Sequence, residues 1–493
     1  NPANDNISLT TAPALGGTYT IGSGGDYASF TAAVTALQNY GVCGPVTFRV
    51  FNGTYTQTVS IPEITGASAT NRITFESFNN DSTLVTLQSS STYVVYMNGA
   101  DYITWRKMTI RNSGSGRVMD FVNTTVGNRV ENCRILGYNT TSTSTTYYLI
   151  YQNSTTTVDN NNEFRNNVFE NGSAGVYWNG ASTSPYEQGM IIENNQFINQ
   201  SIYPIYLTYT SGAIIRDNFI DNTQNTYASS RGIWLSYNYN NTRVERNDIR
   251  TKQYGLYLNY LNGTSAQRAV IANNFINVTH PTGTTIYGIY NNYGTYQYIY
   301  HNTISTYNPN TSTSYTIQER YGSYKIYRNN IIRNNGVGGS SNYCLYVQSL
   351  GTGSNFNFND YWWPTGSSYI AYMSNYGSFT PGAWNTFRSS SYGGLNSINV
   401  NPNFISTTNY RHNNALLNVG TNVLSIVPND IDGVTRTTPI TIGASEFKPV
   451  ANDASPTAIL NNPPCSGVNT MQVNVTNYGT ATLNSVVINW SVN

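Results

Sequence analysis

The densest group of charged side chains in the sequence is formed by Asp217, Glu245 and Asp248 together with Arg216 and Arg246. Two carboxylates that flank a glycosidic bond can act as the acid and the base of its hydrolysis. Clustered acids can also bind calcium beside an arginine or lysine that removes a proton. These five residues are therefore the candidate catalytic group, and calcium is the only cofactor that they would call for.

The elements that must position these residues repeat along the chain. The stretch Val244–Ile249 is one copy of the hexad apolar-x-x-Asn-x-apolar. Eight copies begin at Val130, Phe164, Ile192, Ile215, Val244, Ile271, Ile299 and Ile326, and their fourth residues are Cys133, Asn167, Asn195, Asn218, Asn247, Asn274, Asn302 and Asn329. The copies lie 23 to 34 residues apart with no helical pattern between them. This spacing indicates a solenoid, in which one coil cannot bury its apolar face alone.

The second residue of successive hexads alternates in charge. These residues are Glu131, Arg165, Glu193, Arg216 and Glu245. If the coils stack in register about 4.8 Å apart, as neighbouring strands do, each charge meets opposite charges on both sides. The fourth-position asparagines would form a second ladder and satisfy the turn backbone. A further ladder is expected from the third residues, Asn132, Asn166, Asn194, Asp217 and Asn273. The sequence thus predicts a parallel β-helix, and the charged group has a structural explanation as well as a catalytic one.

A second repeated strand carries an aromatic residue between two aliphatic ones. The aromatic residues are Tyr177, Tyr206, Trp234, Tyr257, Tyr290 and Tyr346. Because side chains of a strand alternate between its two sides, the aliphatic residues should point inward and the aromatic ones outward. Such a stripe could stack on sugar rings and bind a repeating glycan. It could equally stabilise the sheet by cross-strand packing.

Composition excludes several classes of function. The net charge is +1 and only 10% of the residues are charged, which argues against a nucleic-acid partner, since phosphate binding needs clustered Lys and Arg. No apolar run approaches the roughly 18 residues of a membrane span. The four cysteines, Cys43, Cys133, Cys344 and Cys465, lack metal-ligand spacing. We therefore expect no bound metal, and we interpret Cys133 as a buried substitute for a ladder asparagine.

The chain divides into three parts by pattern. Residues 1–16 form an extended lead, and residues 17–447 form the β-helix. Within the β-helix we expect a cap helix at about 26–39, capped by Asp26 and ended by Gly41, coils at about 46–361 and an irregular, aromatic-rich closing region at about 362–447. Residues 448–493 form a partial Ig-like module, because about three strands are present where a complete sandwich needs about seven.

Several motifs resemble one family of secreted proteins. They are Gly44-Pro-Val-Thr-Phe-Arg-Val50, Asn52-Gly-Thr-Tyr55, Asp430-Ile-Asp-Gly-Val-Thr-Arg436 and Ile442-Gly-Ala-Ser-Glu-Phe447. Together with the coil pattern they are similar to the large secreted β-helix proteins of Bacteroidetes-type bacteria, in the pectate-lyase-like superfamily. The resemblance implies a right-handed single-stranded parallel β-helix that is exported to the cell surface or the medium. It also implies lyases or hydrolases of acidic polysaccharides as possible relatives.

Three functions are compatible with these features. The chain could be a polysaccharide lyase or hydrolase, a carbohydrate-binding solenoid, or a non-catalytic surface protein such as an adhesin or a filament subunit. None of the histidines His280, His301 and His412 lies in a hydrolase-like Gly-His-Gly. His301 stands at the third position of its hexad, where a ladder substitute is expected. We favour the non-catalytic surface protein.

Two further expectations concern modification and assembly. The triplet Asp81-Ser82-Thr83 resembles a short O-glycosylation signal, which makes Ser82 a candidate glycosylation site. The partial module at residues 448–493 lacks strands, and the lead contains a spare one at Ile7–Thr11. An extended segment can complete the open sheet edge of another chain, so chains could link end to end. Neighbouring domains of a longer chain would serve the same purpose.

Overall fold

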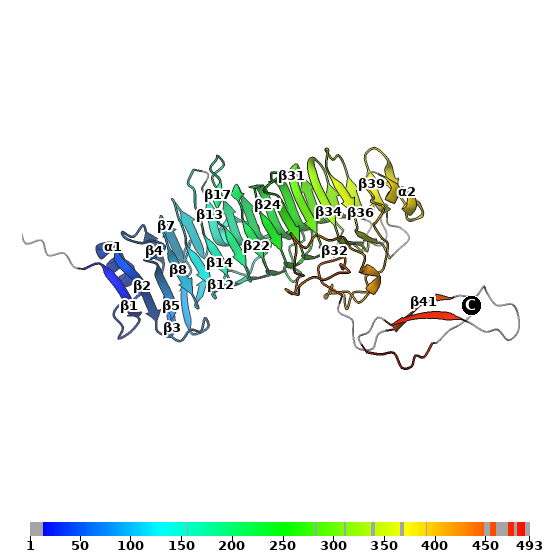
Figure 1. Cartoon of the computed structure of the whole chain (residues 1–493). Coiled ribbons are helices and arrows are strands. Elements are labelled where there is room, and N and C mark those ends of the chain that lie inside the picture. Colours follow the sequence, from blue (N-terminus) through cyan, green and yellow to red (C-terminus); the bar gives the residue numbers. More distant parts are fainter. Residues whose placement is uncertain are drawn as a thin grey trace, which may run out of the picture.

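The protein is a parallel β-solenoid of about 12 coils with very little helix (Figure 1). The computed structural model describes residues 13–447, apart from 155, 282, 310–311, 337–340, 365–368 and 391, and then residues 454–459, 472–477 and 481–488. The predicted stacking of the coils is therefore confirmed. Apolar side chains of every coil fill the interior in one continuous core.

Each coil contributes strands to three faces. The hexad face consists of β1 (Leu15–Ile21), β2 (Val42–Val50), β5 (Ile73–Ser77), β8 (Ile103–Arg106), β11 (Arg129–Glu131), β14 (Glu163–Arg165), β18 (Ile191–Glu193), β22 (Ile214–Arg216), β25 (Arg243–Glu245), β28 (Ala269–Ala272), β31 (Gly294–Tyr300), β34 (Gly322–Arg328) and β37 (Asn355–Asn357). The short face consists of β3 (Gly53–Thr56), β6 (Val85–Ser89), β9 (Thr109–Asn112), β12 (Arg134–Leu136), β15 (Val168–Glu170), β19 (Gln196–Ile198), β23 (Phe219–Asp221), β26 (Asp248–Thr251), β29 (Phe275–Thr279), β32 (Thr303–Tyr307), β35 (Ile331–Asn334) and β38 (Asp360–Trp362).

The third face carries the aromatic stripe and is called the aromatic face. It consists of β4 (Val59–Pro62), β7 (Val95–Asn98), β10 (Met119–Val122), β13 (Tyr148–Asn153), β16 (Ala174–Asn179), β20 (Tyr203–Thr208), β24 (Arg231–Tyr239), β27 (Tyr254–Asn262), β30 (Ile286–Asn292), β33 (Ser314–Glu319), β36 (Asn342–Val347) and β39 (Tyr369–Met373). Two short strands, β17 (Glu187–Gln188) and β21 (Thr210–Ser211), pair with each other between this face and the hexad face. The pairing along all three faces is parallel from coil to coil.

A tight corner between the hexad face and the short face explains the hexad pattern. Its third residue adopts a left-handed conformation, with φ of 56° at Asn132, 55° at Asn194 and 57° at Asp217. Asn and Asp tolerate this conformation better than most residues. Asn and Asp therefore suit the third position because of the backbone, although Arg246 and His301 also occupy it, each with φ of 54°. Side chains of neighbouring third positions bond to each other at Asp217 and Arg246.

The fourth residue of the hexad points inward and forms the predicted asparagine ladder. The Oδ1 atom of Asn247 accepts hydrogen bonds from the backbone N–H of Asn218 at 3.1 Å and from its Nδ2 at 2.9 Å. The Nδ2 atom of Asn247 donates to the carbonyl oxygen of Ile215 at 3.1 Å and to Oδ1 of Asn274 at 2.9 Å. The same contacts recur at Asn167, Asn195, Asn274 and Asn302. Side chains of the next coil thus satisfy the backbone groups of the buried turn that do not pair with backbone.

The prediction was wrong by one residue at the last of the eight hexads. Tyr327, rather than Ile326, pairs with Ile299. Asn330 therefore occupies the ladder position and Asn329 the left-handed corner, with φ of 58°. The ladder ends at Asn359, whose Oδ1 accepts from the backbone N–H of Asn330 at 3.0 Å. Cys133 holds the first position with a buried side chain, and burial raises the pKa of its thiol to about 12.

A helix caps the first coil, as predicted, but it is shorter. Helix α1 spans Phe30–Tyr40 and buries Phe30, Val34 and Leu37 against the core. Its N-cap is Ser29, whose Oγ accepts from the backbone N–H of Ala32 at 3.1 Å. Asp26, the expected cap, instead accepts from the backbone N–H and the hydroxyl of Thr20, each at 2.7 Å. Gly41 ends the helix with φ of 65°.

The region expected to close the solenoid divides into two parts. Strands β39 and β40 (Gly377–Phe379) form an antiparallel hairpin, and α2 (Trp384–Ser389) places the fully buried Phe387 against the ring of Tyr361 in the last coil. Residues 398–447, called the strap, run back along the outside of the solenoid (Figure 1). Gly443 N–H donates to the carbonyl oxygen of Asn329 at 2.7 Å. The closing region is therefore both an end cap and a side cover.

The two ends of the chain are only partly described. Residues 1–12, which contain the spare strand Ile7–Thr11, lie outside the described residues, as does Cys465. Strands β41 (Ala454–Ile459) and β42 (Val473–Asn477) form an antiparallel hairpin, whereas residues 486–488 are not in a strand. The complete Ig-like module and the end-to-end linkage stay predictions.

Candidate functional site

The alternating charges of the hexads lie side by side on the hexad face. The residues of this charge ladder are paired in register, Glu131 with Arg165, Arg165 with Glu193, Glu193 with Arg216 and Arg216 with Glu245. The ladder also extends upstream, because Glu131 is paired with Arg106, Arg106 with Glu76 and Glu76 with Arg49. These three residues lie within the coils predicted at about 46–361, and the same alternation could have identified them.

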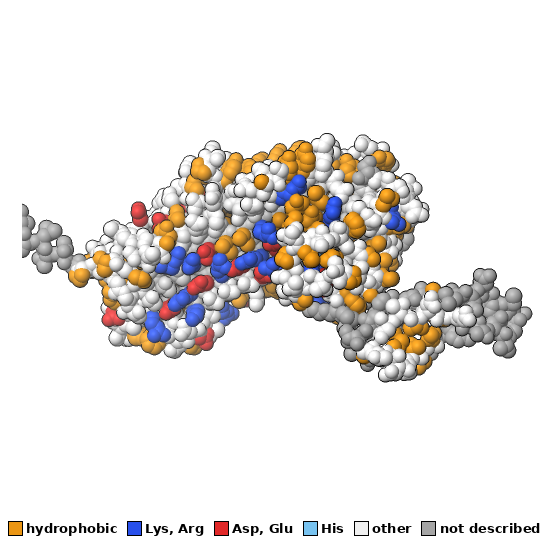
Figure 2. Space-filling view, in the orientation of Figure 1, with side chains coloured by type: hydrophobic (Ala, Val, Ile, Leu, Met, Phe, Trp, Pro, Cys, Tyr) orange, Lys and Arg blue, Asp and Glu red, His pale blue; other side chains and the backbone are white. Residues whose placement is uncertain are grey.

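Figure 2 shows the ladder as a row of alternating blue and red side chains across the part of the hexad face that the strap leaves uncovered. Arg106 Nε lies 2.5 Å from Glu76 Oε2, and Arg216 Nη2 lies 2.7 Å from Glu193 Oε2. Arg165 forms a further ion pair with Glu193. Each acid of these pairs thus faces arginines on both sides, which is the arrangement that a structural ladder requires.

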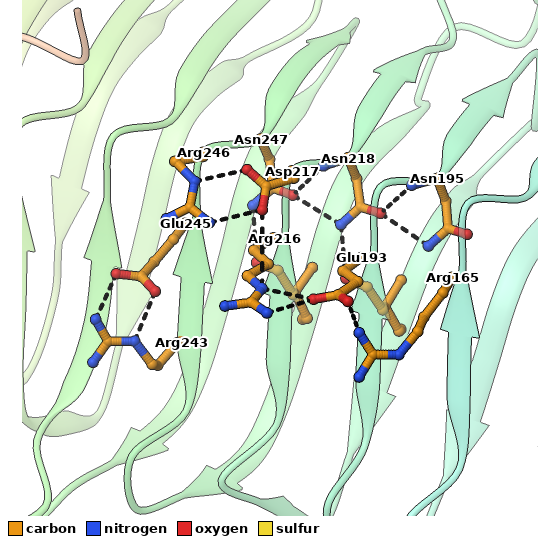
Figure 3. A network of polar contacts seen from close by, with 12 residues as sticks. Arg165, Glu193, Asn195, Arg216, Asp217, Asn218, Arg243, Glu245, Arg246 and Asn247 are labelled. Carbon is orange, nitrogen blue, oxygen red and sulfur yellow. Dashed lines mark hydrogen bonds and ion pairs between the residues drawn. The ribbon is translucent and has the colours of Figure 1, made fainter. Parts of the chain in front are cut away.

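The acids of the candidate catalytic group form similar ion pairs with arginines (Figure 3). Both oxygens of Asp217 are held by Arg246, with Oδ1 2.7 Å from Nε and Oδ2 2.7 Å from Nη2. Both oxygens of Glu245 are held by Arg243, at 2.7 and 2.6 Å. Such two-point pairs between arginine and carboxylate are among the strongest polar contacts at a protein surface.

Asp248 lies apart from the other two acids. It begins strand β26 of the short face, around the corner from Glu245, and its Oδ2 lies 2.8 Å from Nη2 of Arg250. Burial raises the pKa of this carboxyl group, which its ion pair with Arg250 partly counteracts. Arg216 lies between Glu193 at 2.7 Å and Asp217 at 3.9 Å. Arg250 bonds to both oxygens of Asp248, at 3.3 and 2.8 Å. Each of the three acids is thus held by an arginine at both oxygens, and no two of them form a free acid and base pair.

The aromatic stripe forms a stack in which the rings cover one another. Trp234 and Tyr257 are stacked with ring centroids 3.4 Å apart, and Tyr177 and Tyr206 are stacked at 4.4 Å. The stripe is interrupted at Gln318, which is paired with both Tyr290 and Tyr346. Because the ring faces lie against neighbouring rings, the stack presents edges and hydroxyl groups outward. Sugar rings therefore cannot stack on the ring faces wherever neighbouring rings of the stripe cover one another.

Two further rows of tyrosines accompany the stripe and were missed in the sequence. One row, three positions earlier in the strands, contains stacked neighbours such as Tyr254 and Tyr287 at 4.6 Å. The other occupies left-handed backbone positions, where Tyr237 and Tyr260 have φ of 53° and 51° and stack at 4.8 Å. Bulky residues rarely adopt this conformation. The regular spacing of these tyrosines was the available signal, but it lies outside the hexads.

The remaining predicted residues have structural partners. Ser82 lies in the turn between β5 and β6, where Oδ1 of Asp81 accepts from the backbone N–H and the hydroxyl of Thr83 at 2.8 and 2.7 Å. His301 is fully buried at a hexad corner, with Nδ1 3.2 Å from the carbonyl oxygen of Gly443 in the strap and Nε2 3.0 Å from Nδ2 of Asn329. Burial lowers the pKa of His301, so the ring is neutral at pH 7. Its place at the third position of a hexad agrees with a corner residue rather than a ligand.

Part of the chain matches a known protein family. Residues 156–282, about a quarter of the chain, match the family model described as "Periplasmic copper-binding protein (NosD)". No curated protein sequence matches the chain. None of the described helices is long and apolar enough to cross a membrane.

Several solved structures are similar to the chain at low identity. They include rice weevil pectin methyl esterase (13% identity, 55% of this chain and 78% of that chain covered, TM-score 0.32) and DFA-IIIase from Arthrobacter chlorophenolicus A6 (10% identity, 67% and 88% covered, TM-score 0.41). The periplasmic alginate epimerase AlgG is similar at 12% identity, with 66% and 74% covered and a TM-score of 0.35. Likenesses at this level do not bear on what the chain binds or catalyses.

The matched segment is poorly suited to binding copper. Copper prefers Cys, His and Met ligands, and residues 156–282 contain no Cys, one His and one Met. That histidine, His280, has its Nε2 atom 3.0 Å from the carbonyl oxygen of Ala228. Across the described part of the chain, no three His, Cys, Asp or Glu residues are grouped so that they could hold a metal ion.

Proposed function

We propose that this chain is a non-catalytic structural solenoid that acts outside the cytoplasm as a rigid surface or spacer element. The observation that supports the proposal best is the pairing of the candidate catalytic group. Asp217 and Glu245 are each bound at both oxygens by an arginine. Each pair fixes the carboxylate on an arginine through one bond to each oxygen, which suits a structural role better than the proton transfer of a general base.

The ladders give a physical reason for rigidity. Neighbouring coils are joined by backbone pairing, and in the middle of the solenoid also by the asparagine ladder inside and by stacked rings outside. In the open half they are also joined by the charge ladder. Neighbouring coils are the only partners that these side chains need, which suits a rod whose surface is not used for chemistry.

The location outside the cytoplasm is supported by the family match, since the matching family is described as periplasmic. The composition is compatible with it, because a surface rich in amides, hydroxyls and phenols stays hydrated with only 10% charged residues.

An activity assay tests the proposal. The purified chain is incubated with pectate and with alginate, with calcium and with a chelator, and unsaturated products and new reducing ends are measured. We expect no product above that of a sample without protein. Product that disappears in Asp217→Asn or Glu245→Gln would show that the paired carboxylates take part in catalysis and would overturn the proposal.

A second candidate function is binding of a polymer along the aromatic face. It is favoured by the rows of phenol hydroxyls and ring edges, which repeat once per coil along that face. A glycan array with the wild-type chain and with Trp234→Ala/Tyr257→Ala tests it, and Tyr376→Ala, at a residue that is 55% exposed away from the stack, is the control. Binding that is equal in all three proteins would exclude this face.

A further inference from the structure

A cavity of about 340 Å³ lies where the strap meets the short face of the solenoid. Its lining consists of Arg333 in β35 and of the strap residues Asn401, Asn403, Phe404, Ser406 and Thr407. The volume falls in the range of pockets that hold small ligands, about 300 to 1,000 Å³. Neither the asparagine ladder nor the charge ladder uses these residues.

The guanidinium of Arg333 is partly buried without an acidic partner. Other arginines of the strap and the short face, Arg250, Arg411 and Arg436, each form an ion pair with a carboxylate. None of the ion pairs among the described residues involves Arg333. Burial lowers the pKa of Arg333, and the phenol of Tyr410 counteracts this only in part. Charges inside proteins are normally paired, because an unpaired one is costly, so Arg333 lacks a counter-ion.

Two of the three guanidinium nitrogens of Arg333 are available to a ligand. Nη1 donates to Oγ of Ser305 at 3.3 Å. Nε and Nη2 have no partner within the described residues, and neither atom is sealed from solvent. The ring of Phe404 lies beside the guanidinium, with its centroid 5.6 Å from Cζ. Arg333 therefore offers free N–H donors and a positive charge to the cavity that it lines.

The strap loop on the other side of the cavity is held in place by its own hydrogen bonds. Asn403 has a left-handed φ of 49°, and its N–H donates to Oδ1 of Asn401 at 3.1 Å. The carbonyl oxygen of Asn401 accepts from Nδ2 of Asn414 at 2.7 Å, and that of Asn403 accepts from the N–H of Asn413 at 3.2 Å. The cavity is thus formed without a ligand, and Asn403 and Thr407 add an amide and a hydroxyl to its lining.

The lining carries one positive charge and no negative one. A carboxylate also carries a single charge, and its two oxygens can accept from two nitrogens of one arginine. The pair of Arg246 and Asp217 shows this geometry in the same molecule, with Nε and Nη2 as the donors. We propose that this cavity binds the carboxylate of a small organic acid, whose oxygens accept from Nε and Nη2 of Arg333.

Saturation-transfer NMR on the full chain, in a phosphate-free buffer, tests the proposal. The probes are D-gluconate, the neutral D-glucitol and the doubly charged D-glucitol 6-phosphate, which share one carbon skeleton. We expect transfer to D-gluconate and none to D-glucitol, and the transfer should weaken as sodium chloride screens the charge. Absence of transfer to D-gluconate, or equal transfer to D-glucitol, would overturn the proposal. Stronger transfer to D-glucitol 6-phosphate would overturn the assignment to a carboxylate.

Variants locate the binding. Arg333→Gln should weaken D-gluconate binding about tenfold or more, the effect of losing hydrogen bonds between charged groups. Arg111→Gln is the matched control, because Arg111 is the third residue of β9 as Arg333 is of β35, and it is exposed outside the cavity. It should bind as the wild type does.

A second variant serves if Arg333→Gln does not fold. Thr407 is an exposed residue of the lining, so Thr407→Glu should supply a competing carboxylate and abolish transfer to D-gluconate, whereas Thr407→Gln should keep it. Binding of D-gluconate that is unchanged in folded Arg333→Gln or in Thr407→Glu would place the acid elsewhere and contradict the assignment.

Discussion

The two halves of the hexad face have the same backbone and carry different chemistry. From Arg49 to Glu245 the face is open, and the second hexad position alternates between Arg and Glu. In the next two coils the strap covers the face, and the same position is Ala272 and then Tyr300. Both of these side chains are buried with Val423 and Val427 of the strap.

The third hexad position changes in the same way. In the open half it holds Asn, Asp and, at Arg246, Arg in the left-handed corner. Under the strap the corner residues bind the strap backbone as well, Asn273 through the carbonyl oxygen of Asn429 at 2.7 Å and Asn329 through that of Thr421 at 2.8 Å. Whether the strap covers a coil, rather than the position in the coil, therefore decides which side chains stand on its hexad face. A row of charges on this solenoid marks an uncovered surface.

The asparagine ladder lies beneath both halves, so breaking it should have the largest effect. In Asn247→Leu the Nδ2 and N–H groups of Asn218 and the carbonyl oxygen of Ile215 lose their partners. Each buried group left unpaired costs about 1–3 kcal/mol, and we expect a total loss of about 3–5 kcal/mol in the free energy of unfolding. Denaturant unfolding measures it. Asn385→Leu, at an exposed helix residue, is the control and should change stability little.

Extending the charge ladder by one arginine should destabilise only the half of the hexad face that the strap covers. Ala272→Arg continues the alternation after Glu245, but its side chain would enter the apolar contact with the strap. An uncompensated buried charge should destabilise the strap by about 2–4 kcal/mol. Limited proteolysis should then cut within residues 398–447 faster than in the wild type. Thr18→Arg, on the exposed part of β1, should leave the cleavage rate unchanged, and equal rates in both variants would contradict the account.

The interior also differs between the halves. Glu319 in the covered half is paired with Lys325 at 2.8 Å, with both side chains fully buried. Glu187 in the open half accepts a hydrogen bond from the indole N–H of Trp178 at 2.5 Å and has no ion pair within the described residues. Burial, together with the charge of Asp159, raises the pKa of Glu187 to about 8.

A pH series can sharpen this difference. Because the folded state holds the proton of Glu187 between its ordinary pKa, near 4.5, and about 8, the folded state binds more protons than the unfolded state in that window. Stability should therefore fall as the pH rises from about 4.5 to about 8 and level off above that. Glu187→Gln should flatten the dependence of melting temperature on pH, whereas Glu170→Gln, at a partly exposed carboxylate, should not. An unchanged slope in Glu187→Gln would show that Glu187 ionises freely.

Much of the fold could be predicted because one residue type meets two demands at once. Asparagine at the fourth hexad position caps a buried turn and bonds to the next coil, so it recurs with the coils. The error at Asn329 arose where two asparagines adjoin and only the pairing of Tyr327 decides between them. The cap helix was misplaced because Asp26 bonds to Thr20 instead of to a helix N-terminus.

The strap and its cavity could not be predicted from the sequence. The strap has no periodic pattern, and its contacts join residues far apart in the chain, such as Asn273 and Arg436 at 2.7 Å. Four of the five residues of the candidate catalytic group are neighbours at the hexad face. The fifth, Asp248, lies around the corner on the short face. Alternation alone could not reveal that arginines grip both oxygens of Asp217 and Glu245, because Arg243 lies outside the hexads.

The most direct test of the central claim is the melting temperature of Asp217→Asn. Asparagine keeps the left-handed corner, so the substitution removes only the charge that faces Arg246 and Arg216. If the charged group is structural, the melting temperature should fall, by the equivalent of about 1 kcal/mol for a partly exposed pair. Residues kept for catalysis commonly cost stability, so a melting temperature that rises in Asp217→Asn would contradict the structural account.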